Sequence, residues 1–195
     1  VGEVVKAFGN LLQVKFDGNI RQGEVAMVHV DDQQLKAEVI EIVGEEAKLQ
    51  VYEDTRGIGL GTKVYFTEDL LEAELGPGLL SSVVDGLQNP LEELALQSGF
   101  FLNRGIYMPP LNREKKWAFE PIAKVGDVLK RGMFLGKTPE AHFEHRIMIP
   151  FSIYGEVTIT EIAPQGEYTV EEVIAKGRDE SGTEHSFKMM QKWPV

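Results

Sequence analysis

The sequence predicts a mainly β protein made of two small β-rich domains joined by a connector with short helices. Many short valine-rich runs are separated by glycines, of which the 195 residues contain 20, and this spacing is typical of strands joined by tight turns. The composition, with 43% hydrophobic and 26% charged residues, is that of a folded globular protein with a substantial core. No heptad pattern, low-complexity tract or repeat of fixed period is evident.

Residues 1–70 are predicted to form a small six-stranded β-barrel. Glycine or acidic turns bound the expected strands, which cover residues 3–8, 11–16, 24–30, 35–43, 47–52 and 63–66. Closure into a barrel would leave no unpaired strand edge. Within the fourth strand the apolar alternation that runs through Val39 slips to Ile40 and Ile42. Such a slip predicts a β-bulge.

Residues 71–98 are predicted to be the connector, because glycines and prolines enclose two short apolar runs there. Ser81 is expected to cap a short helix that contains the Val83-Val84 pair. Pro90 is expected to open a second helix through residues 91–95, since proline is tolerated in the first turn.

Residues 99–187 are predicted to form a second β-rich domain. The expected strands lie at residues 117–119, 128–129, 133–135, 146–149, 155–162, 170–175 and 184–189. Turns, each containing a glycine, are expected at residues 125–127, 130–132, 164–166 and 179–182.

Composition also excludes several classes of function. The formal net charge of −11 disfavours nucleic acid and anionic membrane surfaces as partners, because lysine and arginine supply most of that binding. The absence of cysteine excludes a disulfide scaffold, a thiolate metal site and a cysteine nucleophile, and agrees with a cytoplasmic location. Residues 1–8 begin directly with a strand pattern, so we expect no signal peptide. The most apolar later stretch, residues 147–154, is too short for a membrane span.

The strongest candidate for a binding motif is the stretch at residues 132–138, which ends in Gly-Lys-Thr and resembles a phosphate-binding P-loop. A P-loop needs four residues between its first glycine and the Gly-Lys pair, and this stretch has one fewer. Pro139 follows at once, where a P-loop requires a helix. A strand followed by a turn is therefore the favoured interpretation.

The histidines are weak candidates for a metal site. His142 and His145 flank Glu144, but on a strand the two histidines face opposite sides, and on a helix they would need a third ligand. We expect them to be solvated surface residues. His29 and His185 are isolated on expected strands.

Paired carboxylates and one basic run complete the candidates. The pairs of adjacent acidic residues are Asp31-Asp32, Glu45-Glu46, Glu92-Glu93 and Glu171-Glu172. No base, nucleophile or metal ligand accompanies them, so they are interpreted as turn residues rather than acid–base catalysts. The run from Arg113 to Trp117 is interpreted as the start of a strand with an aromatic anchor. The sequence thus predicts no catalytic, cofactor-binding or metal-binding residue.

The connector contains the most specific motifs of the chain. Glu-Leu-Gly-Pro-Gly-Leu-Leu at residues 74–80 and Asp-Gly-Leu-Gln-Asn-Pro-Leu at residues 85–91 resemble the segment that joins barrel and catalytic domain in the catalytic A (alpha) subunit of V-type and archaeal A-type rotary ATPases. Gln-Val-Tyr-Glu-Asp-Thr-Arg-Gly at residues 50–57 is similar to a second motif of that family. Asn89 stands where the family has arginine.

The resemblance extends through the second domain. Residues 99–187 correspond to the insertion, or bulge, that distinguishes A subunits from their relatives, and residues 188–195 resemble the return to the nucleotide-binding domain just before its P-loop. The hairpins at residues 125–136 and 155–157 also resemble biotinyl/lipoyl domains of the barrel-sandwich type. Such carriers display a lysine at a hairpin tip, and the tip around residues 142–146 has none.

The resemblance implies a non-catalytic N-terminal portion of an ATP-hydrolysing or ATP-synthesising subunit. No cofactor is expected in this portion, whereas the parent subunit would bind Mg-ATP and couple its turnover to proton or sodium transport. The implied partners are B subunits, in an alternating hexameric ring, and peripheral stalk subunits. The implied location is cytoplasmic, peripheral to the membrane through the complex. The alternatives are a biotinyl/lipoyl-like carrier or binding module and a β-barrel domain of a translation-type GTPase, which the acidic charge disfavours.

Overall fold

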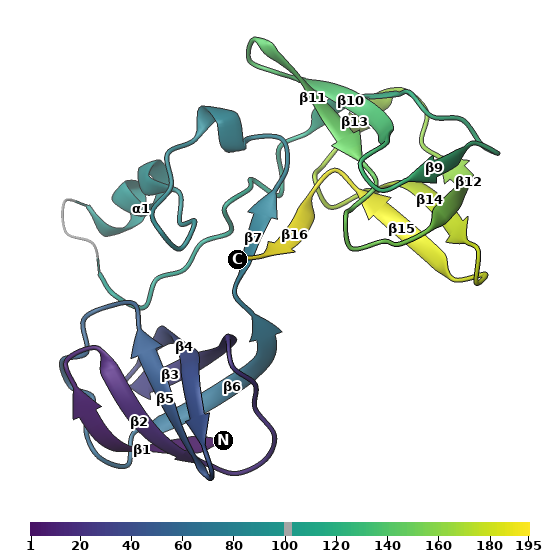
Figure 1. Ribbon diagram of the computed structural model, residues 1–195. Coiled ribbons are helices and arrows are strands. Elements are labelled where there is room, and N and C mark those ends of the chain that lie inside the picture. Colours follow the sequence, from purple (N-terminus) through teal and green to yellow (C-terminus); the bar gives the residue numbers. More distant parts are fainter. Residues whose placement is uncertain (100–102) are drawn as a thin grey trace. The chain divides into compact units, whose positions relative to one another are not determined.

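The chain divides into two units in the computed structural model, which describes residues 1–99 and 103–195 (Figure 1). The first, here called the barrel unit, comprises Val1–Ala73, Leu94–Tyr107 and Pro194–Val195. The second, here called the sandwich unit, comprises Glu74–Glu93 and Met108–Trp193. Each unit has its own hydrophobic core.

The barrel unit contains a closed six-stranded barrel, which confirms the predicted architecture. Its strands are β1 (Gly2–Phe8), β2 (Leu11–Phe16), β3 (Glu24–Val30), β4 (Gln33–Val43), β5 (Glu46–Val51) and β6 (Lys63–Leu70). They pair in the order β1-β2-β5-β4-β3-β6, and β6 closes the barrel by pairing with β1. Closure satisfies the backbone groups that an open sheet would leave at its edges.

Alternation along the strands fills the barrel. Leu35, Ala37 and Val39 of β4 are fully buried, as expected for side chains on one face of a strand. The register between β4 and β5 shifts between Val39 and Glu41, so the predicted β-bulge is confirmed. After the bulge Ile42 pairs with the buried Ala47 and so shares its face, although Ile42 itself is 36% exposed near the end of β4.

The sandwich unit consists of two four-stranded sheets. In order, the first contains β11 (Phe143–Met148), β10 (Phe134–Glu140), β8 (Trp117–Pro121) and β13 (Gly166–Tyr168). The second contains β15 (Glu184–Lys188), β14 (Val173–Asp179), β12 (Glu156–Ile162) and β9 (Val128–Lys130). Both sheets contribute buried residues to one core, among them Phe119, Leu135, Ile147, Ile159, Ile174 and Phe187.

The connector is less helical than predicted. A single 3₁₀ turn, η1, covers Leu79–Ser81 and starts after Gly78. The predicted helix over Val83 and Val84 is wrong, because Val84 instead forms a β-bridge with Pro90. The helix after Pro90 is confirmed as α1 (Leu91–Ser98). Two unpredicted strands, β7 (Glu72–Leu75) and β16 (Gln191–Pro194), form a two-stranded sheet.

Three strands of the sandwich unit differ from the prediction by three or more residues at an end. The strand expected at residues 146–149 starts earlier, as β11, at Phe143. The strand expected at residues 133–135 continues as β10 to Glu140. The strand expected at 170–175 starts only at Val173, because the carboxylate of Glu172 accepts a hydrogen bond of 2.6 Å from the Thr169 N–H and forms a turn there. Strand β13 was not predicted, since a three-residue strand gives little periodicity. Within the described ranges, no helix has the length and apolar character that crossing a bilayer would require.

Candidate functional site

The Gly-Lys-Thr stretch lies in the middle of strand β10, where it pairs with β11. A Cβ atom on Gly136 would lie 2.2 Å from Cε2 of Phe119, so glycine is required there by packing against the neighbouring strand. Lys137 points its ammonium group at Glu144, 2.9 Å away, and at Glu120, 3.7 Å away. The stretch is therefore part of a strand, in agreement with the favoured interpretation, although the turn comes after Glu140 rather than after Leu135.

The structure gives each histidine a different environment. His142 is exposed, as predicted. The prediction that His145 is a solvated surface residue is wrong, because its side chain is only 24% exposed and Nδ1 lies 2.8 Å from the buried carboxylate of Glu140. His185 lies 2.9 Å from Asp179, and His29 packs on the ring of Tyr65. The described part of the chain contains no group of three potential His or carboxylate metal ligands.

Most of the acidic pairs are local turn or helix-end residues. Asp31 adopts a positive φ of 53° in the turn between β3 and β4. Glu92 and Glu93 occupy the first turn of α1, where negative charge stabilises a helix. The backbone hydrogen bond from Thr169 holds the pKa of Glu172 below its ordinary value.

The basic run leads into strand β8, which starts at Trp117, the predicted aromatic anchor. Arg113 forms ion pairs with Glu74, at 2.5 Å, and with Glu171, at 3.3 Å. The ammonium group of Lys115 lies 4.0 Å from the ring centre of Trp117, which is 7% exposed. The cation–π contact and the ion pairs show a run engaged within its own unit.

The family-like motif at residues 50–57 is the centre of a joint in the barrel unit, here called the Glu53 joint. The carboxylate of Glu53 accepts a 2.9 Å hydrogen bond from the Gly105 N–H and a second one from the Tyr107 hydroxyl. The same hydroxyl accepts a 2.6 Å bond from the Lys36 N–H. Gly105 has a φ of 76° and lies so close to β4 that a Cβ atom would be 3.2 Å from the Gln34 carbonyl.

Arg104 completes the Glu53 joint. Its Nη1 donates to the carbonyl of Asp54 at 2.8 Å and to that of Arg56, and its Nε donates to Oε1 of Gln33 at 2.7 Å. These bonds satisfy carbonyl groups of a loop that has no sheet partner. Residues 104–107, which follow the connector in sequence, are thereby fastened to the barrel through polar contacts.

The other family-like motif, at residues 74–80, contacts the two four-stranded sheets of the sandwich unit, here called the sandwich domain, at what we call the Glu140 joint. The side chain of Glu140, 1% exposed, lies at the end of β10. Its Oε1 accepts hydrogen bonds from the N–H groups of Gly78, at 2.6 Å, and Leu80, at 3.1 Å, and its Oε2 contacts Nδ1 of His145. The first N–H groups of a helix have no partner within the helix. Glu140 therefore caps η1 from a distant strand.

Glycine is needed at two positions of this motif for separate reasons. Gly78 has a φ of 115°, which strongly favours glycine. Gly76 approaches the backbone of the returning chain so closely that a Cβ atom would lie 3.2 Å from Cα of Met190 and 3.0 Å from Leu111. Both features allow the backbone at positions 76 and 78 to lie close against the rest of the sandwich unit, because no side chain intervenes there.

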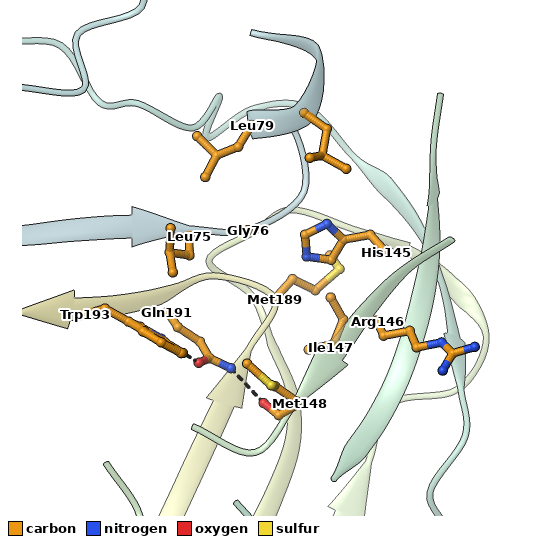
Figure 2. A pocket seen from close by; sticks show the side chains of 11 residues that line it. Leu75, Gly76, Leu79, His145, Arg146, Ile147, Met148, Met189, Gln191 and Trp193 are labelled. Atoms are coloured by element: carbon orange, nitrogen blue, oxygen red, sulfur yellow. Dashed lines mark hydrogen bonds between the residues drawn. The ribbon is translucent and has the colours of Figure 1, made fainter. Parts of the chain in front are cut away.

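A hollow of about 230 Å³ lies beside the Glu140 joint within the sandwich unit (Figure 2). The connector, β11 and the returning chain line it, with Leu75, Gly76, Leu79, Leu80, His145, Arg146, Ile147, Met148, Met189, Gln191 and Trp193. Figure 2 shows Gln191 bridging two of these segments: its Nε2 donates to the Met148 carbonyl at 2.7 Å, and its Oε1 accepts a 3.0 Å bond from Trp193. Since the lining is mostly apolar, the hollow does not suit a nucleotide phosphate.

Two family models match the chain. The model described as "ATP synthase alpha/beta family, beta-barrel domain" matches residues 4–68, and "ATPsynthase alpha/beta subunit barrel-sandwich domain" matches residues 108–195. Curated relatives include V-type ATP synthase alpha chains of Protochlamydia amoebophila, 65% identical over 194 residues, Chlamydia muridarum, 58%, and Chlamydia abortus, 56%. Each of these alignments covers 100% of the chain and 33% of the relative.

The chain belongs to the ATP synthase alpha/beta family. The resemblance to V-type A (alpha) subunits is confirmed by its relatives, and the predicted barrel-sandwich type of the second domain by the family model. The chain spans about a third of the length of these relatives. The carrier alternative is not favoured, because the model that matches residues 108–195 describes a domain of ATP synthase subunits.

Among solved structures, the assembled type III secretion ATPase EscN of enteropathogenic E. coli is similar at 21% identity and a TM-score of 0.43. The match covers 65% of this chain and 30% of that one. A similarity of this size adds nothing to the assignment made from the family models and relatives.

Sequence reasoning missed both joints of this ATP synthase family member. Glu140 had no signal in simple alternation, because residues 137 and 139, not Glu140, share the face of Leu135 when the strand is continued. The register shift between Phe134 and Gly136, a β-bulge that the sequence did not indicate, turns Thr138 and Glu140 inward. Glu53 gave no signal in the local sequence, because its partners Gly105 and Tyr107 lie 52 and 54 residues further along the chain. The departure at Asn89 also has a structural basis: Asn89 is 4% exposed, its Nδ2 donates to Asp85 and its Oδ1 accepts the Met108 N–H.

Proposed function

We propose that this chain is a non-catalytic portion of the A subunit of a V-type rotary ATPase, which couples ATP turnover to proton or sodium translocation. The observation that supports this most directly is the 65% identity to a V-type ATP synthase alpha chain over 194 residues. In this proposal the parent subunit binds Mg-ATP next to a B subunit, and the nucleotide chemistry resides outside these 195 residues. The parent would be cytoplasmic and peripheral to the membrane through its complex.

The geometry of the chain supports a structural rather than a chemical role. Lys137, the lysine of the P-loop-like stretch, is paired with carboxylates. Both family-like motifs form joints between segments of the chain. We therefore expect calorimetry on the 195-residue chain to detect no heat of binding with millimolar Mg-ATP. ATP hydrolysis by this chain would contradict the proposal.

The parent subunit provides the decisive test. The full-length A subunit, assembled with B subunits and the remaining subunits in vesicles, is expected to hydrolyse ATP and to acidify or load the vesicle lumen. Comparing proton-sensitive and sodium-sensitive dyes would identify the ion. A complex that forms but neither hydrolyses ATP nor moves an ion would overturn the assignment.

For the barrel we propose a role in ring assembly with B subunits. Phe8 and Leu60 on this unit are 70% and 78% exposed, and burial of such side chains stabilises association. Replacing both with serine is expected to lower the yield of the A–B ring in native mass spectrometry, whereas Glu45→Ser on the same unit should leave it unchanged. Equal yields for the three proteins would contradict this role.

For the sandwich domain we propose contact with a peripheral stalk subunit. Phe143 and Tyr154 are 65% and 76% exposed there, which leaves aromatic side chains for a partner. Crosslinking mass spectrometry of the assembled complex should join the stalk to lysines of this domain, such as Lys130. Crosslinks from the stalk to the barrel unit alone would contradict the proposal.

A further inference from the structure

The connector segment at residues 76–80 has few side chains with which to hold its position. Gly76 and Gly78 have no side chain, and Leu80 is 65% exposed. The apolar contribution of the segment comes from the small ring of Pro77, which is buried, and from Leu79, which packs partly against the core of the sandwich unit. Hydrophobic burial, which fixes most segments of a fold, is therefore limited here.

Glu140 holds this connector segment in position through hydrogen bonds. Its carboxylate is buried, and its partners within the described part of the chain include donors that lie outside β10: the connector N–H groups of Gly78 and Leu80 and the ring of His145. Hydrogen bonds to an ionised group are shorter and stronger than neutral ones, and their direction is fixed. A buried carboxylate that loses its donors is strongly disfavoured. The connector can thus leave this position only if Glu140 is solvated at the same time.

We propose that Glu140 is a positioning residue that locks the connector to the sandwich domain, so that the two move as one body when force passes through the connector. His145 fixes the orientation of the Glu140 carboxylate by holding Oε2, which leaves Oε1 for the connector. The mechanical role rests on the proposed function as part of a rotary ATPase; the lock itself does not.

The same hairpin provides a matched control. Glu144, on β11, is also a carboxylate, but its side chain is 47% exposed and it pairs with Lys137 on the outer face. Glu144→Gln removes a charge from the same hairpin without touching the connector. Glu140→Gln removes the buried charge with almost no change in shape.

Hydrogen exchange on the 195-residue chain tests the lock. In Glu140→Gln and Glu140→Ala, exchange of the Gly78 and Leu80 amides should accelerate about tenfold or more, and Glu144→Gln should leave it unchanged. The amides of Ile149 and Ala163, which bond to Met133 and Ile174 in the sheets and loops of the same unit, report whether the domain stays folded. Unchanged exchange at Gly78 and Leu80, or an equal rise at Ile149 and Ala163, would overturn the lock.

The assembled complex tests the mechanical role. With Glu140→Gln in the full-length A subunit, ATP hydrolysis should persist, while the number of ions moved per ATP hydrolysed should fall about twofold or more; Glu144→Gln should match the unmodified complex. An unchanged ion-to-ATP ratio in the Glu140 variant would overturn the role. If the unmodified complex itself neither hydrolyses ATP nor moves ions, the proposed function fails instead, and the exchange result still decides whether the lock exists.

Discussion

Replacing Gly136 with alanine separates the packing explanation of the Gly-Lys-Thr stretch from a phosphate-binding one. A Cβ atom at this position would lie 2.2 and 2.5 Å from the Phe119 ring and 2.8 Å from the Glu120 carbonyl, against a normal contact of about 3.5–4.0 Å between carbon atoms. Phe119 is fully buried, and the carbonyl belongs to the backbone of β8. Because neither neighbour can move aside easily, we expect Gly136→Ala to destabilise the sandwich unit by about 3 kcal/mol or more.

Tryptophan fluorescence during urea unfolding provides the assay. The chain has 2 tryptophans, and both, Trp117 and Trp193, belong to the sandwich unit, so the signal reports this unit alone. Gly86→Ala is the control, since nothing lies within 4 Å of a Cβ atom at that position and the change should stay within about 0.5 kcal/mol or be slightly stabilising. A cost below about 1 kcal/mol for Gly136→Ala would refute the packing argument.

Three further changes test other polar contacts. Tyr107→Phe should destabilise the barrel unit by about 1–3 kcal/mol in urea unfolding followed by circular dichroism, because Glu53 and the Lys36 N–H both lose a partner; Tyr65→Phe, on a ring 42% exposed, should have little effect. Asn89→Ala should cost about 1–3 kcal/mol in the fluorescence assay, because it leaves the Met108 N–H unpaired, and a neutral result would contradict this. Hydrogen bonds from Ser181 and His185 hold the pKa of Asp179 well below its ordinary value, so the stability that Asp179→Asn removes at pH 7 should shrink once the pH falls below about 4, the unfolded-state value. A difference in melting temperature that stays constant from pH 7 to pH 2 would exclude this contribution.

The strands of the barrel were predictable because each exposes one face to solvent and the other to the core. Under that condition apolar residues tend to alternate, and the break in alternation after Val39 marks a bulge. The connector was harder, because Val83 and Val84 are β-branched residues in a segment without periodicity. There the bridge between Val84 and Pro90, which closes a tight local loop, prevailed over the capping signal at Ser81.

The end of β10 was placed too early in the prediction for a related reason. Lys137, Pro139 and Glu140 have low strand propensity, so the strand was expected to end at Leu135. Pairing with β11 overrides that preference as far as Glu140. Once the strand stops short in the prediction, Glu140 seems to belong to a polar turn, and its neighbour His145 to the surface.

The two joints show why their partners could not be inferred from local patterns. In each, a glutamate receives backbone N–H groups, of Gly105 at Glu53 and of Gly78 and Leu80 at Glu140. Every residue except proline has an N–H group, so the identity of the donor residue says nothing about this contact. What the sequence does record is the space that the contact needs: the donors at positions 78 and 105 are glycines with positive φ. Such a contact thus needs two things from the sequence: a glutamate side chain that accepts the hydrogen bond, and a glycine whose lack of a side chain lets its N–H come close. It follows that Gly78→Ala should weaken the Glu140 joint although the glycine contributes no side-chain contact, and hydrogen exchange at Leu80 would measure that loss.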